Sequence, residues 1–153
     1  MYDAEPAPEK AMSTPEENKE IVRRYTREVF DDGNVAAVDR YLAPDFYNHV
    51  TGKSGNEDFK QLARDVGRMA GSANVIELLV AEGDFVVAYM TITRTLHTEL
   101  RVFGFTFPGD GRSYTVKHVH IYRVADGKIR EHWAVRDDLG LLRQLGALSE
   151  PVT

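Results

Sequence analysis

Apolar and polar positions alternate along the last third of the chain in a pattern that predicts a β-hairpin. One face of its first strand carries Val116, His118, His120 and Tyr122. Asp126-Gly127 is a strong signal for the tight turn that follows. Steps of two along the second strand group Glu131, Trp133, Val135 and Asp137. We expect both groups to share one sheet surface, where imidazoles, the single tryptophan and a carboxylate would line a pocket.

The first half of the chain has helical periodicity instead. Thr14, Pro15 and Glu17 form a capping signal for a first helix. Its apolar stripe comprises Ile21, Val22, Tyr25, Val29 and Phe30. Asn34 can cap a short second helix, which Pro44 stops, and a third helix begins near Asn56. The aromatic segment 45–50 between the last two is predicted to be extended.

Two predicted strands, 75–82 and 85–95, carry apolar residues on both faces and are joined by a turn at Gly83-Asp84. An antiparallel sheet with one solvated face would not show this pattern. We therefore expect helices on one face and a second copy of the chain on the other, which predicts a homodimer or higher homo-oligomer. Segment 97–107 is ambiguous, and 139–148 is predicted to be a closing helix.

The order of three helices, a run of strands and a closing helix predicts an α+β fold, with the helices packed on a strongly curved antiparallel or mixed sheet. A length of 153 residues suits one domain with one core. We divide the chain into a mobile N-terminal tail (1–13), a single domain (14–148) and a short C-terminal tail (149–153). The N-terminal tail is acidic and rich in proline and alanine, so it cannot bury much apolar surface.

Composition narrows the classes of function. The formal net charge is −5 and no cluster of Lys and Arg occurs, which argues against a nucleic acid or an anionic membrane as partner. No apolar run is long enough to span a bilayer. The absence of cysteine excludes disulfides, thiolate nucleophiles and cysteine-based metal sites. With no targeting signal recognised, a cytoplasmic location is the default expectation.

Four segments resemble the SnoaL-like polyketide cyclases and predicted ester cyclases of the nuclear-transport-factor-2-like superfamily. They are NKEIVRRYTREVFDDGN, LAPDFYNHV, AEGDFVVAYMTITRT and DGKIREHWAVRDDLGLLRQLG. The last is the most specific, with Glu131-x-Trp133-x-x-x-Asp137 followed by Leu-Gly-Leu-Leu-x-Gln-Leu-Gly. The resemblance runs from about Glu16 to Gly146 and implies a cone-shaped α+β barrel.

The resemblance also implies an activity. It implies an enzyme without metal or organic cofactor that closes a ring by intramolecular aldol condensation of a hydrophobic polyketide-like ester. Asp137 matches the family's acid/base aspartate, while His120 and His49 match its pocket histidines. An apolar setting makes a buried carboxylate a better base near neutral pH. The residues expected to contact substrate are Trp133, His118, Tyr122 and Phe46.

Alternative functions stay open at this point. The same scaffold hosts isomerases, epoxide hydrolases and non-catalytic modules that bind a small molecule. An isomerase would use Tyr122 as an oxyanion donor, and no second acid is evident for that role. The spacing of His118 and His120 also suits a metal, with His49 or Asp137 completing the ligand set.

Individual residues have alternative interpretations as well. Asp137 or Asp138 could cap the closing helix, and Asp138 is better placed to do so. His97 and His132 are expected at the surface, and His132 should lie on the opposite strand face from Trp133.

Overall fold

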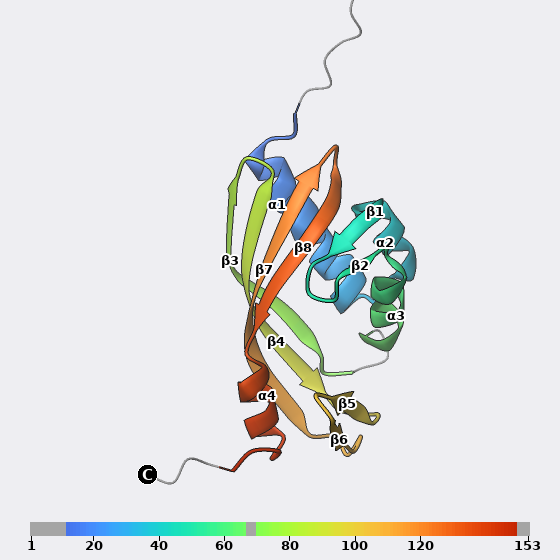
Figure 1. Cartoon of the computed structure of the whole chain (residues 1–153), viewed down its shortest axis with the longest axis vertical. Helices are drawn as coiled ribbons and strands as arrows, with labels where there is room; N and C mark the ends of the chain where they lie inside the picture. Colours follow the sequence, from blue (N-terminus) through green and yellow to red (C-terminus); the bar gives the residue numbers. More distant parts are fainter. Residues whose placement is uncertain (1–11, 67–69, 150–153) are drawn as a thin grey trace, which may run out of the picture.

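The computed structural model describes residues 12–66 and 70–149, which form helices packed on one face of a curved sheet (Figure 1). The elements in chain order are α1 (Pro15–Tyr25), η1 (Thr26–Asp31), α2 (Val35–Tyr41), β1 (Leu42–Asn48), β2 (Lys53–Ser54), α3 (Glu57–Val66), β3 (Ala73–Glu82), β4 (Phe85–Thr95), β5 (Leu100–Val102), β6 (Phe105–Phe107), β7 (Ser113–Ala125), β8 (Lys128–Arg136) and α4 (Asp138–Gln144). The tails expected at 1–13 and 149–153 fall mostly outside the described residues, which exclude 1–11 and 150–153.

The main sheet has the strand order β2-β1-β8-β7-β4-β3. β1 runs parallel to β8, and every other neighbouring pair in this sheet is antiparallel. The ambiguous segment 97–107 contains a small separate hairpin, β5-β6. In Figure 1 this hairpin and α4 lie at the opposite end of the molecule from the start of α1. The expected α+β class and mixed, curved sheet are confirmed.

The predicted caps form as expected. Thr14 accepts a hydrogen bond from the Glu17 backbone, and the Glu17 carboxylate accepts one from the Thr14 backbone, completing the capping box of α1. Asn34 accepts from the backbone N–H of Ala36 at the start of α2. The end of α1 continues into η1, a π-helical turn. Such turns are rare and are frequent at functional sites.

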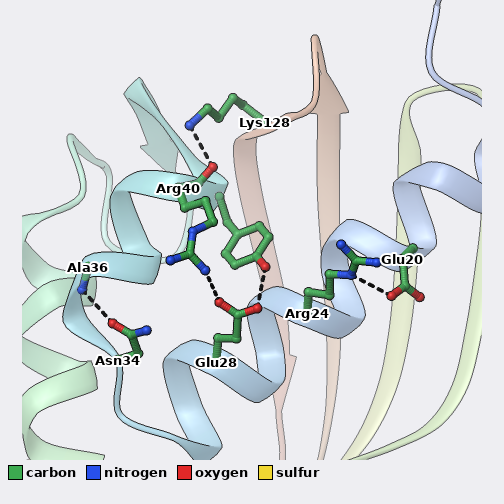
Figure 2. Close-up of polar contacts among 8 residues, drawn as sticks. Glu20, Arg24, Glu28, Asn34, Ala36, Arg40 and Lys128 are labelled. Carbon is green, nitrogen blue, oxygen red and sulfur yellow. Dashed lines mark hydrogen bonds and ion pairs between the residues drawn. The ribbon is translucent and has the colours of Figure 1, made fainter.

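Polar contacts attach these helices to the end of the sheet. The Glu28 carboxylate of η1 accepts a hydrogen bond from Arg40 of α2, and Lys128 of β8 donates to the Arg40 carbonyl over 2.7 Å (Figure 2). The Tyr41 hydroxyl also donates to Glu28, over 2.7 Å. Because the three elements share one network, η1 is held in a defined position above the sheet.

The core fills the space between these helices and the concave face of the sheet. Fully buried side chains from both layers include Val22, Tyr25, Val29, Val38, Phe46, Val86, Ala88, Val124 and Ile129. No helix in the described part of the chain is both long and apolar enough to cross a membrane.

The other face of the sheet is not covered. Its exposed apolar side chains include Val75, Leu78, Val80, Phe85, Tyr89 and Val135. Monomeric proteins rarely leave such a contiguous apolar surface in water. Both faces of this sheet are apolar, as the sequence pattern indicated, and the described helices cover only one of them. The second copy of the chain expected on the other face stays a prediction.

Candidate active site

The hairpin of β7 and β8 has a register that differs from the simple one expected. Its turn forms as predicted, with positive φ at Asp126 (53°) and Gly127 (73°), and Ala125 pairs with Lys128. The register then shifts, since Val124 pairs with Ile129 but Arg123 pairs with Glu131. This one-residue bulge on β8 turns every later side chain of β8 to the other face.

The bulge overturns the expected shared surface. Tyr122 lies opposite His132, His120 opposite Ala134, and His118 opposite Arg136. These are the inward-facing residues. Trp133 instead pairs with Ile121 on the outer face, so the expectation that Trp133 shares a surface with His118 and His120 is wrong.

The concave side of the sheet contains a cavity of about 640 Å³. This volume is typical of sites for small organic ligands. Its apolar wall includes Phe30, Phe59, Leu62, Met90, Ile92 and Tyr122. Its polar lining includes Thr26, Asn48, Arg94, Tyr114, His118, His120, His132 and Arg136.

Three imidazoles form a hydrogen-bonded chain along one wall of this cavity. His118 Nδ1 lies 3.3 Å from His120 Nε2, and His120 Nδ1 lies 2.9 Å from His132 Nε2. His132 Nδ1 is in turn 3.2 Å from Oδ1 of Asn48, which β1 places beside His132 through the parallel β1–β8 pairing. We call these four residues the histidine chain.

Burial keeps the histidine chain uncharged. It lowers the pKa of His118 to about 4, of His120 to about 3 and of His132 to about 4. After burial, the Arg136 guanidinium contributes for His118, and the neighbouring His132 contributes for His120. At neutral pH all three imidazoles are therefore neutral and can each donate and accept one hydrogen bond.

Other residues that line the cavity carry hydrogen-bond donors. Burial raises the pKa of Tyr122 above its ordinary value of 10.0, so its phenol stays protonated. Arg94 donates to the backbone carbonyls of Ala73 and Thr93 and to Oδ1 of Asn74. The buried Oγ1 of Thr26, on the π-helical turn, has no hydrogen-bond partner among the described residues. Such a buried hydroxyl calls for an explanation, and a bound ligand would provide one.

His49 and Trp133, expected in the pocket, meet on the outer side of the sheet. Their rings stack with centroids 4.2 Å apart and an interplanar angle of 10°. His49 Nε2 lies 3.0 Å from Oε1 of Glu131, which also accepts a hydrogen bond from Arg123. Neither His49 nor Trp133 lines the cavity.

Asp137 is the N-cap of α4. Its carboxylate accepts a hydrogen bond from the backbone N–H of Gly140 over 2.8 Å, and the side chain does not line the cavity. A Cβ at Gly140 would lie only 2.2 Å from Oδ2 of Asp137, so glycine is needed there for this cap. The cap is therefore Asp137 and not Asp138. The catalytic role expected for Asp137 stays a prediction.

Phe46 lies in the core and not in the cavity wall. It is fully buried and packs edge-on against Phe59, with ring centroids 5.2 Å apart. His118, His120 and Tyr122 are the expected site residues that do line the cavity.

The imidazoles do not converge on a common centre. Their ring nitrogens are directed at one another along the histidine chain. No group of three or more His, Asp or Glu side chains in residues 12–66 and 70–149 is arranged to hold a metal ion.

Several cavity residues were not anticipated from the sequence. His132, expected at the surface, is only 6% exposed and connects His120 to Asn48 in the histidine chain. Strand alternation did separate His132 from Trp133, so the signal was present, but the wrong member of the pair was assigned to the pocket. Asn48, Arg94 and Thr26 carry no comparable signal, since only the tertiary structure brings them to the cavity.

Comparisons with known proteins identify the family of this chain. The family profile of the SnoaL-like polyketide cyclases matches residues 20–145. Nogalonic acid methyl ester cyclase from Streptomyces nogalater is 34% identical over 123 residues, which cover 76% of this chain and 89% of that protein.

Solved structures share the fold of this chain. TsrD from Streptomyces laurentii superposes with a TM-score of 0.75 at 26% identity, over 89% of this chain and 99% of TsrD. An LEH-like epoxide hydrolase from M. tuberculosis shares the fold at 18% identity, with a TM-score of 0.64 over 86% of this chain and 90% of its own. The extent of the profile match and the identity to the nogalonic acid methyl ester cyclase show that the chain belongs to the SnoaL-like polyketide cyclase family.

Proposed function

We propose that this protein is a cofactor-independent cyclase that closes a ring of a hydrophobic polyketide-like ester by intramolecular aldol condensation. The observation that carries the proposal is the cavity itself, with an apolar wall on one side and a chain of neutral imidazoles on the other. An aldol closure needs a base, a donor for the developing oxyanion and a pocket that brings the reacting ends together.

The cavity offers a group for each of these tasks. A neutral imidazole is the base, and the protonated phenol of Tyr122 or the guanidinium of Arg94 stabilises negative charge on a carbonyl oxygen. The apolar wall, with Phe30 and Met90, accommodates a flat hydrophobic substrate. The carboxylate first expected as the base, Asp137, is engaged by the α4 backbone outside this cavity.

The direct test is ring closure of the esters named for the relatives. We expect the purified protein to convert nogalonic acid methyl ester or aklanonic acid methyl ester, the latter named for two relatives 46% identical over 39 residues, into a cyclised isomer of unchanged mass. Chromatography with mass spectrometry detects the product, and a chelator in the buffer should not slow the reaction. A protein that binds these esters but leaves them unchanged would instead favour a binding module.

We also propose that the uncovered sheet face is the interface of a homodimer. The exposed apolar side chains of β3 and β4 support this assignment, since burying them would remove the unfavourable contact with water. The outward-facing Leu78 and Val80 lie near the middle of β3.

Sedimentation tests the dimer. At micromolar concentration we expect a dimer for the unaltered protein and a monomer for Leu78→Arg, because the charge would be buried in the interface. Leu62→Arg is the matched control, since Leu62 is also exposed but belongs to α3, on the side of the sheet opposite the proposed interface. A monomeric unaltered protein, or a dimer that persists in Leu78→Arg, would contradict the assignment.

A further inference from the structure

We propose that the histidine chain is a proton relay of fixed direction, in which Asn48 sets the tautomer of each ring and Nε2 of His118 is left as the base that faces the substrate. The inference deepens the proposed function, because the reaction it serves is the proposed ring closure. The direction of the relay, however, depends only on the histidine chain and can be tested without a substrate.

Asn48 defines one end of the relay. Its Oδ1 accepts a hydrogen bond from the backbone N–H of Val50 over 3.0 Å. A backbone N–H can only donate, so this side-chain atom is an acceptor oxygen whichever way an amide could be placed. The second lone pair of Oδ1 faces Nδ1 of His132 at 3.2 Å, and that nitrogen must therefore carry a hydrogen.

The hydrogen on Nδ1 of His132 determines the tautomers of all three rings. A neutral imidazole carries one N–H, so His132 with hydrogen on Nδ1 can only accept at Nε2. Nδ1 of His120 must then donate to it over 2.9 Å, which makes Nε2 of His120 an acceptor. Nδ1 of His118 in turn donates over 3.3 Å. Nε2 of His118 remains, with a free lone pair, on a residue that lines the cavity.

β7 and β8 contribute no carboxylate to the cavity that could act as the base in place of an imidazole. The inward-facing residues of β7 from Tyr114 to Val124 and of β8 from Ile129 to Arg136 include no Asp or Glu. The carboxylates that line the cavity, Asp58 and Asp65, come from α3. Asp58 pairs with Lys53, and Asp65 accepts from Gln61. The bases on the sheet side of the cavity are therefore imidazoles.

The charges around His118 come from several elements. Arg136 of β8 and Arg94 of β4 disfavour the imidazolium, whereas Asp137 and Asp138 at the start of α4 favour it. On its own strand His118 also faces His120. The same arginines that disfavour a resident positive charge are suited to stabilise a negative enolate in the cavity.

Proton abstraction and ring closure involve only the substrate and the relay. The C–H bond between two carbonyl groups breaks, its proton goes to Nε2 of His118, and its electron pair forms the enolate. The enolate carbon then forms a C–C bond with the acceptor carbonyl carbon, and the alkoxide oxygen takes the proton back from His118. During the step the Nδ1 proton of His118 can shift toward Nε2 of His120, which spreads the positive charge along the rings.

Nitrogen-15 NMR of histidine-labelled protein at pH 7 tests the direction of the relay. We expect His118, His120 and His132 all to carry hydrogen on Nδ1, and we expect Asn48→Leu to produce mixed tautomers at His118 although that residue is two rings away. Hydrogen on Nε2 of His118 in the unaltered protein, or unchanged tautomers in a folded Asn48→Leu variant, would overturn the relay. The measurement on the unaltered protein decides the question even if the variant does not fold.

A second measurement tests the base. Deuterium exchange at the acidic carbon of methyl benzoylacetate, a hydrophobic β-keto ester, reports proton abstraction without ring closure. We expect catalysed exchange that falls by about 100-fold or more in His118→Gln and is unchanged in His97→Gln, which alters an exposed histidine. Absence of exchange above the buffer rate, or full exchange by His118→Gln, would refute His118 as the base. Exchange and the expected tautomers without cyclisation of either ester would leave the relay standing and contradict only the proposed cyclase.

Discussion

His118→Gln should lower kcat for ring closure by about 10²–10⁴-fold, the usual contribution of a positioned general base. Glutamine keeps a side chain of similar reach but has no titratable nitrogen to take the proton. Because His118 is half-buried in the cavity wall and not in the core, the loss should appear in kcat with little change in stability. Stopped-flow or steady-state assays on the ester that proves to be the substrate measure it.

Asp137→Asn is the informative comparison. Its amide oxygen can still accept from Gly140, and asparagine is as good an N-cap as aspartate, so both kcat and stability should stay near those of the unaltered protein. Asp137→Ala removes the cap and should cost about 1 kcal/mol of unfolding free energy. If instead Asp137→Asn abolished turnover and His118→Gln did not, the base would be Asp137 and our assignment of the relay would be incorrect.

The sequence was sufficient for most of the fold because the relevant signals are local. The capping box at Thr14 and Glu17, the cap at Asn34 and the turn at Asp126-Gly127 each involve residues within a few positions of one another. The apolar residues on both faces of β3 and β4 likewise reflect what each strand packs against.

The candidate site was predicted less well because it depends on one non-local detail. A simple register from the Ala125–Lys128 turn would place Trp133 opposite His120, whereas the bulge near Arg130 places Ala134 there. Nothing in the sequence of residues 123–131, RVADGKIRE, indicates that bulge, since β8 has neither a glycine nor a proline at that point. One extra residue thus exchanged Trp133 for His132 as the pocket residue.

The helix cap shows a related limit. Both Asp137 and Asp138 are acceptable caps by type, and only the backbone geometry after β8 decides between them. The short distance that a Cβ at Gly140 would have to Asp137 explains the choice. The motif that suggested a catalytic aspartate is thus also explained by the start of a helix.

The exchange of Trp133 for His132 also gives the two sheet faces different chemistry. The inner face carries the histidine chain, whose proton positions are set by one amide. The outer face carries His49 stacked on Trp133 and paired with Glu131, beside the exposed apolar residues. His49 therefore lies on the proposed dimer face. We expect His49→Gln to affect association more than turnover.

The unfolding free energy should fall as the pH is lowered from about 6.5 to about 4, before most carboxylates titrate. In the folded state the pKa of His132 is lowered from 6.5 to about 4, so the unfolded chain binds more protons in this window and acid favours unfolding. The contribution of His132 to the unfolding free energy is therefore fully present above pH 6.5 and decreases toward pH 4. At roughly 1.4 kcal/mol per pKa unit, His132 alone accounts for about 3 kcal/mol of this loss.

Urea denaturation at a series of pH values measures the effect, and two variants identify its source. His132→Gln should make the curve between pH 6.5 and 4 less steep without flattening it, because His118 and His120 also have lowered pKa values. His97→Gln should leave the curve unchanged because His97 is exposed. The carboxylates with lowered pKa, such as Glu131 and Glu77, lose their contribution only below their ordinary value of 4.5, so the two effects occupy different pH ranges. A curve that stays flat from pH 7 to 5 would mean that the imidazoles are not buried as neutral rings, and the relay would then lose the condition on which its direction depends.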